Sequence, residues 1–239
     1  MRAKIPCMLT TRVKICGITR PEDAALAAEL GADAIGLNFM AGPRRITVSA
    51  AHAILEATPG LVNAVALCRG NQQAKADDPL GLFDVVNASP RLRVTTFQLY
   101  GASVQLAADI AEPFQCWFVF PITSRESLIQ PTIMSSNVSG VWPRSVTGVI
   151  FDTASEKLGG TGQSFNWNWI AEARAVGELD NLPPLILAGG LTPDNVADAI
   201  RIAKPYAVDV SSGVEIPNKP GIKDPLKLRD FIQAAKSAR

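Results

Sequence analysis

The sequence VKICGITRPEDAALAAELGADAIGLNF, residues 13–39, decides the fold. It opens with the apolar run Val13–Cys16, turns into the Ala-rich segment Pro21–Glu29, which has helical spacing, and closes with a second apolar run, Ala34–Phe39. Pro and acidic residues open the helical segment, where free N–H groups and the helix dipole favour them, and Thr19 is the expected N-cap. The stretch therefore predicts a strand, a helix and a second strand parallel to the first.

The same pattern recurs along the rest of the chain. Eight apolar runs are the expected strands, at Val13–Cys16, Ala34–Phe39, Val62–Cys68, Val94–Leu99, Cys116–Phe120, Gly148–Phe151, Leu185–Ala188 and Ala207–Val210. The other expected helices are Ser49–Ala57, Ser103–Ile110, Asn168–Ala175, Pro193–Ala203 (capped by Thr192) and Pro225–Ala238, with weaker ones near Gln73–Leu82 and Arg125–Gln130. Pro131 should end the last of these, which leaves 131–147 as an irregular excursion.

This alternation of strands and helices predicts an α/β fold, a single (β/α)8 TIM barrel. The barrel should span residues 12–239, with residues 1–11 as an N-terminal extension. An open, doubly wound sheet is the competing architecture. It is disfavoured because eight strands alternate with about eight helices in ~225 residues. Neither a G-x-G-x-x-G nor a P-loop motif follows any strand, so dinucleotide binding and P-loop functions lose their main support.

Composition excludes several classes of partner. The chain has 23 Lys and Arg against 22 Asp and Glu, and 6% aromatic residues, so it offers no strongly basic surface for nucleic acid. No apolar run approaches the ~20 residues that cross a membrane, and the run Ile5–Leu9 is too short for a secretory signal. A cytoplasmic protein with no nucleic-acid or membrane partner is expected.

Metal binding is not expected either. The four cysteines form no C-x-x-C pair, and His52 is the single histidine. We expect reduced thiols, and His52 on a helix face, away from any strand end.

Cys16 ends the first expected strand, at the edge where barrel enzymes place their chemistry. Lys14, two residues earlier, shares its face, so its ammonium group should lower the thiol pKa. The alternative is that Cys16 is a small buried apolar residue.

Asp152 follows the apolar run Gly148–Phe151. Asp is uncommon in strands and costly to bury alone, which favours a functional carboxyl. A helix N-cap or turn Asp is the alternative. Against it, residues 154–164 contain three glycines and no prompt helix, which is typical of a mobile loop over a site.

Small residues follow the last two expected strands and predict an anion site. The candidate phosphate-binding residues are Gly189, Gly190, Ser211, Ser212 and Gly213. Their backbone N–H groups can approach a ligand closely, and this region of a barrel often binds phosphate. Asp209 should form an ion pair with Lys14, because the first and last strands of a closed barrel are neighbours. The alternative is that this pair only neutralises two charges in the core and has no role in the site.

Two arginines, Arg44 and Arg45, follow the second expected strand. Two adjacent arginines in a surface loop are usually solvated. Beside a phosphate site and a thiol, one of them could bind a second anionic group through its fork of donors.

These motifs, in this order, resemble the phosphoribosylanthranilate isomerase family of tryptophan biosynthesis. The resemblance covers about residues 12–237. It rests on the segments VKICGITRPEDA, GADAIGLNF, PRRIT, FDTASEKLGGTGQSFNW, LAGGLTPDNV and AVDVSSGVE.

The resemblance implies an isomerase that converts N-(5-phosphoribosyl)anthranilate by an Amadori rearrangement, without a cofactor. By motif position, Cys16 is the general base and Asp152 the general acid, whose pKa should be raised so that it stays protonated. Arg44, or Arg45 if the preceding loop is one residue short, contacts the anthranilate end. Asp209 is the inward carboxylate of the site. A monomer or weak homodimer that binds a small phosphorylated substrate is expected.

The chain also departs from the family pattern. The fourth expected strand reads Gln98-Leu99-Tyr100-Gly101 where the family usually has His in place of Tyr, and the third and fifth strands also differ. Two other functions therefore remain open. One is a catalytically silent paralogue that binds a phosphorylated ligand. The other is a barrel isomerase of a different phosphosugar amine, although the histidine-pathway analogue carries paired strand-end Asp residues where this chain has Cys16.

Overall fold

The computed structural model describes residues 10–70, 82–103, 105–106, 113–136, 142–153 and 164–238. The predicted N-terminal extension falls mostly on residues 1–9, outside these ranges, as does most of the predicted glycine-bearing loop at 154–164. The helix predicted near Gln73–Leu82 also lies almost entirely outside them.

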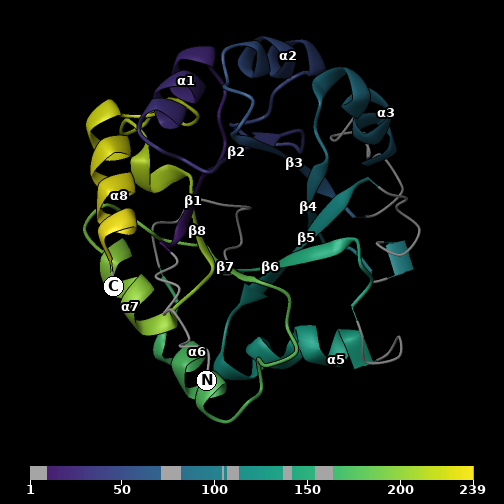
Figure 1. The fold of residues 1–239 in the computed structure, drawn as a ribbon, viewed down its shortest axis with the longest axis vertical. Helices are drawn as coiled ribbons and strands as arrows, with labels where there is room; N and C mark the ends of the chain where they lie inside the picture. Colours follow the sequence, from purple (N-terminus) through teal and green to yellow (C-terminus); the bar gives the residue numbers. More distant parts are fainter. Residues whose placement is uncertain are drawn as a thin grey trace, which may run out of the picture.

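Eight parallel strands form a closed barrel in the order of the sequence (Figure 1). They are β1 Arg12–Ile15, β2 Ala34–Asn38, β3 Asn63–Arg69, β4 Thr96–Tyr100, β5 Gln115–Ile122, β6 Val146–Thr153, β7 Leu185–Leu187 and β8 Ala207–Val210. β1 pairs with β8 and so closes the sheet. The predicted (β/α)8 barrel is confirmed.

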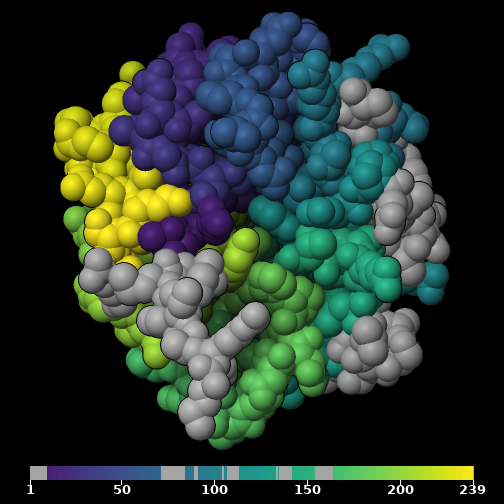
Figure 2. All heavy atoms as spheres, viewed as in Figure 1, coloured from purple at the N-terminus to yellow at the C-terminus, as the bar shows by residue number. Residues whose placement is uncertain are grey.

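Helices surround the barrel (Figure 1). Those in the described residues are α1 Pro21–Glu29, α2 Val48–Glu56, α3 Leu82–Leu92, α5 Gln130–Ser136, α6 Asn168–Ala175, α7 Val196–Ala203 and α8 Pro225–Ser237. Two short 3-10 helices, η1 Arg125–Ile129 and η2 Ser212–Val214, accompany them. In the space-filling view of Figure 2, the yellow C-terminal helix packs against the purple N-terminal part of the chain. None of the described helices is long and apolar enough to cross a membrane.

Several local predictions were wrong. Thr19 does not cap α1, because its hydroxyl donates to the carbonyl of Gly221 at 2.6 Å, and Arg20 takes the N-cap position. Thr192 does not cap α7, which begins only after Asn195. Residues 131–136 are helical, because Pro131 lies in the first turn of α5, where backbone N–H groups have no partner within the helix.

The strands separate two apolar regions. In β1, Val13 and Ile15 face outward and belong to the main core between strands and helices, whereas Lys14 and Cys16 face the lumen. Trp117 packs against the lumen clusters, and its ring occupies the space that a side chain at position 148 would need. The lumen is therefore filled below its mouth, and a ligand can enter only at an end of the barrel.

Candidate active site

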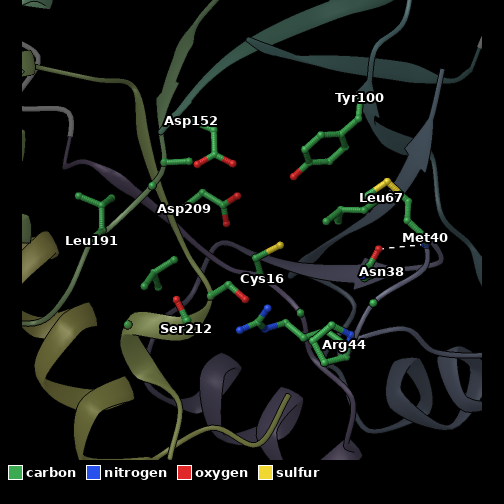
Figure 3. Close-up of a pocket in the computed structure, with 18 of the residues that line it drawn as sticks. Cys16, Asn38, Met40, Arg44, Leu67, Tyr100, Asp152, Leu191, Asp209 and Ser212 are labelled. Atoms are coloured by element: carbon green, nitrogen blue, oxygen red, sulfur yellow. Dashed lines mark hydrogen bonds between the residues drawn. The ribbon is translucent and has the colours of Figure 1, made fainter. Parts of the chain in front are cut away.

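A pocket opens at the carboxyl ends of the strands (Figure 3). All nine predicted site residues line it: Cys16, Arg44, Asp152, Gly189, Gly190, Asp209, Ser211, Ser212 and Gly213. Chain segments more than 190 residues apart in sequence meet here because β8 closes on β1. The predicted site residues thus lie together at one end of the barrel.

Two features fix the position of Cys16: a backbone hydrogen bond, and the lack of a side chain at the neighbouring Gly36. Its amide N donates to the carbonyl oxygen of Val210 at 2.7 Å, one residue past the end of β1. Gly36, on the neighbouring β2, leaves room for the thiol, since a Cβ there would lie 2.8 Å from Cys16 Sγ. The thiol is held in the pocket wall and is 7% exposed.

Lys14 and Asp209 form the predicted ion pair beneath this thiol. The pairing of β1 with β8 sets them side by side, and Lys14 Nζ lies 2.7 Å from Asp209 Oδ2. Burial lowers the pKa of Lys14, but Asp209, with a smaller contribution from Cys16, outweighs it, so the pKa is raised and Lys14 stays protonated. The other carboxylate oxygen of Asp209 has no hydrogen-bond partner among the described residues.

Lys14 lowers the pKa of Cys16 as predicted, but the predicted net lowering was wrong. Burial is the largest influence and raises the pKa of the thiol, and the negative charge of Asp209 raises it further. Lys14 opposes both without reversing them, because its charge is already neutralised by Asp209 at close range. In this arrangement Cys16 is a neutral thiol at neutral pH.

Asp152 belongs to β6, so the alternative of a helix N-cap or turn Asp does not apply. Burial is the main cause that raises its pKa to about 7, and the charge of Asp209 adds to it. This confirms the predicted direction of the shift. Near neutral pH, a substantial fraction of Asp152 is protonated and can donate a proton.

The loops after β7 and β8 form a cradle of small residues. Gly189 has φ +86°, and a Cβ there would lie 2.3 Å from the backbone N of Thr153. A Cβ at Gly213 would lie 1.9 Å from the carbonyl oxygen of Leu191. Asn195 holds the first loop in place, because its amide N donates to the carbonyl of Gly190 at 2.9 Å. Glycine at these positions therefore lets the two loops pack closely against Thr153 and Leu191, and both loops line the pocket.

Of the two arginines, Arg44 lines the pocket, whereas Arg45 is exposed and is not in the pocket wall. The guanidinium of Arg44 donates to both carboxylate oxygens of Glu215, each at 2.7 Å. Lys223 Nζ donates to the same carboxylate at 3.0 Å and to the carbonyl of Ser211 at 3.1 Å. Burial alone would raise the pKa of Glu215. Arg44 and Lys223 outweigh burial and lower this pKa to about 2. Glu215 therefore stays ionised and fixes the orientation of Arg44.

The sequence reasoning missed Glu215 and Tyr100 as residues of the site. The position of Tyr100 at the end of a strand could have suggested it, whereas no local signal connects Glu215 to Arg44, 171 residues away. His52 lies on α2, more than half exposed, 3.4 Å from Glu56, as expected for a residue on a helix face. Among the described residues no group of three His, Cys, Asp or Glu side chains could hold a metal ion.

The barrel is closed, and its mouth carries a thiol, a carboxyl of raised pKa and a cradle of small residues. These features place the protein in the class of (β/α)8-barrel enzymes. The family model that matches residues 13–234 is described as N-(5'phosphoribosyl)anthranilate (PRA) isomerase. The chain belongs to this family.

Individual relatives agree with this assignment. The N-(5'-phosphoribosyl)anthranilate isomerase of Pseudomonas fluorescens is 39% identical over 231 residues, which cover 96% of this chain and all of that protein. The enzyme of the same name from Geobacter sulfurreducens is 37% identical, over 94% of this chain and 98% of its own. The crystal structure of phosphoribosyl anthranilate isomerase from Thermotoga maritima superposes with a TM-score of 0.78 at 30% identity, over 95% of this chain and 98% of that one.

Proposed function

We propose that this enzyme catalyses the Amadori rearrangement of N-(5-phosphoribosyl)anthranilate in tryptophan biosynthesis. The product is 1-(o-carboxyphenylamino)-1-deoxyribulose 5-phosphate. The observation that carries the proposal is the meeting of Cys16, Asp152 and the glycine cradle in one pocket. It is supported by a solved phosphoribosyl anthranilate isomerase in complex with the reduced form of this product, which matches 95% of this chain with a TM-score of 0.74 and 29% identity.

The two reactive groups divide the chemistry between them. Asp152 donates its proton to the furanose ring oxygen, the bond from that oxygen to C1 breaks, and a protonated imine forms between C1 and the anthranilate nitrogen, which keeps its hydrogen. Cys16 then takes the proton from C2, which gives an enolamine. The enolamine converts to the ketone as C1 gains a proton and the C2 hydroxyl loses one. No group is gained or lost overall, so the reaction needs no redox partner and we propose no cofactor.

The remaining residues hold the two charged ends of the substrate. We assign the phosphate to Gly189, Gly190, Ser211, Ser212 and Gly213, which line the pocket from the loops after β7 and β8. Arg44 binds the anthranilate carboxylate with the guanidinium hydrogens that Glu215 leaves free. Asp209 keeps Lys14 in place below the reacting carbons and raises the pKa of both reactive groups.

The pKa values imply an uncommon protonation state during turnover. The proposed acid has a pKa of about 7, and the base has a pKa raised from an ordinary 9.0. The productive form, with a protonated carboxyl and a thiolate, is then a minority of the free enzyme at every pH. We expect kcat/KM to rise up to about pH 7 and to fall only at a pH above the ordinary range of a cysteine thiol.

The direct test measures the loss of anthranilate-type fluorescence as the substrate is consumed. Cys16→Ala and Asp152→Asn should each abolish turnover and leave the affinity for inorganic phosphate unchanged. Normal turnover in either variant would reject the role assigned to that residue. Wild-type enzyme that binds phosphate but does not turn over the substrate would instead indicate a silent paralogue, and activity on a different phosphosugar amine would indicate the other isomerase.

We also propose where the enzyme works and in what form. A thiol base must stay reduced, which the cytoplasm ensures. The pocket is complete within one chain, so the enzyme is proposed to act as a monomer or weak homodimer. Sedimentation at two protein concentrations measures the state, and activity per chain should be the same at both.

A further inference from the structure

Tyr100 is a polar group of the pocket that the mechanism above does not use. It is the last residue of β4, and its ring packs against the lumen cluster that contains Cys16 and Leu67. Figure 3 shows its hydroxyl pointing into the pocket, toward the space between Asp152 and Cys16. The loops that carry Leu191 and Ser212 lie on the opposite side of the pocket.

The hydroxyl is held by one hydrogen bond from below. Gln98, two residues earlier on the same face of β4, is 1% exposed, and its Nε2 donates to the Tyr100 hydroxyl oxygen at 2.9 Å. With Nε2 facing the phenol, the amide donates and the phenol oxygen accepts, while Gln98 Oε1 has no hydrogen-bond partner among the described residues. Within the part of the chain that the structure describes, no protein atom accepts the hydrogen of the phenol. That hydrogen is available to a ligand.

Tyr100 also keeps this hydrogen throughout the working pH range. Burial raises the pKa of the phenol well above its ordinary value, and the negative charges of Asp152, Cys16 and Asp209 raise it further. Tyr100 is therefore a neutral donor and does not compete with Cys16 as a base.

We propose that Tyr100 donates a hydrogen bond to the oxygen on C2 of the substrate sugar, a step that rests on the proposed isomerase function. With the phosphate in the loops across the pocket, the sugar carbons that react lie beside Cys16 and Asp152, where the phenol points. A hydrogen bond to the C2 oxygen draws electron density from C2, so the C2 hydrogen becomes more acidic. Tyr100 thus assists Cys16 in removing that proton and selects substrates with an oxygen at C2.

The test uses Tyr100→Phe, which keeps the ring and its packing and removes only the hydroxyl. We expect kcat/KM to fall roughly 10- to 100-fold, with unchanged inhibition by inorganic phosphate. Substrate with deuterium at C2 should show a larger isotope effect on kcat in this variant, because proton removal becomes slower relative to the other steps. A purely structural role would lower activity without raising the isotope effect. Tyr206→Phe is the matched control, because Tyr206 is half-exposed and lies just before β8, at the other end of the barrel.

A second variant covers the case in which Tyr100→Phe folds poorly. Gln98→Met removes the donor that holds the phenol and should lower kcat/KM less than Tyr100→Phe does. If Gln98 acts only through Tyr100, it should have no further effect in the double variant. Wild-type values of kcat/KM and isotope effect in Tyr100→Phe would overturn the role of Tyr100 alone, whereas a wild-type enzyme without isomerase activity would overturn the function as well.

Discussion

Asp152→Asn should stabilise the folded protein at alkaline pH while it removes the proposed general acid. The pKa of Asp152 rises from an ordinary 3.8 to about 7 because the carboxyl is buried near Asp209. A raised pKa means that the folded state holds the proton more tightly than the unfolded chain does. The contribution of Asp152 is therefore most favourable below about pH 4 and is lost as the pH rises through 7. Asn is neutral at every pH and carries no such penalty.

The size of the effect follows from the two pKa values. A difference of about 3 units corresponds to about 4 kcal/mol, which is fully lost above about pH 8. At about pH 5 the unfolded carboxyl has already ionised, so part of the penalty is present there. Between about pH 5 and pH 8.5, the stability of Asp152→Asn relative to wild type should increase by roughly 3 kcal/mol.

Urea unfolding followed by tryptophan fluorescence measures this difference. Wild type and Asp152→Asn are compared at the two pH values, so effects of the Asn side chain that do not depend on pH cancel. Asp180→Asn is the control, because it removes an exposed carboxylate near the opposite end of the barrel. A stability difference that stays constant from about pH 5 to 8.5 would refute the raised pKa, and with it the argument that Asp152 is protonated near neutral pH.

Three other substitutions test the rest of the site. Lys14→Met should cost about 3–5 kcal/mol in urea unfolding because it leaves the buried Asp209 unpaired, and Lys14→Met with Asp209→Leu should recover most of that loss. Gly36→Ala should cost about 1–3 kcal/mol and lower kcat, because the new Cβ displaces the thiol of Cys16. Glu215→Gln should raise KM roughly tenfold with little change in kcat, because the guanidinium that it orients loses a charged partner. A wild-type KM in that variant would contradict this positioning role.

The barrel and the Lys14–Asp209 pair could be predicted because both follow from periodicity. Strand residues two apart share a face, and the first and last strands of a closed barrel are neighbours. Those two rules are sufficient to bring residues 14 and 209 together, as the register of β1 with β8 shows. The sequence therefore predicts well where the site residues lie in the barrel.

The direction of the Cys16 pKa shift could not be predicted in this way. It depends on a balance between burial, Asp209 and Lys14, and only the position of each group shows which one dominates. The helix caps failed for a related reason. The hydroxyl of Thr19 bonds to Gly221, whose approach is set by the packing of distant segments and not by the local sequence.

The ion pair between Lys14 and Asp209 joins residues 195 positions apart in the chain. During synthesis the first strand leaves the ribosome long before the last one exists, so its ammonium group must remain in water until β8 arrives. Closing the barrel therefore also completes the charge balance beneath the thiol. A nascent chain that stops before β8 lacks Asp209, Ser211, Ser212 and Gly213, and so carries only part of the pocket wall.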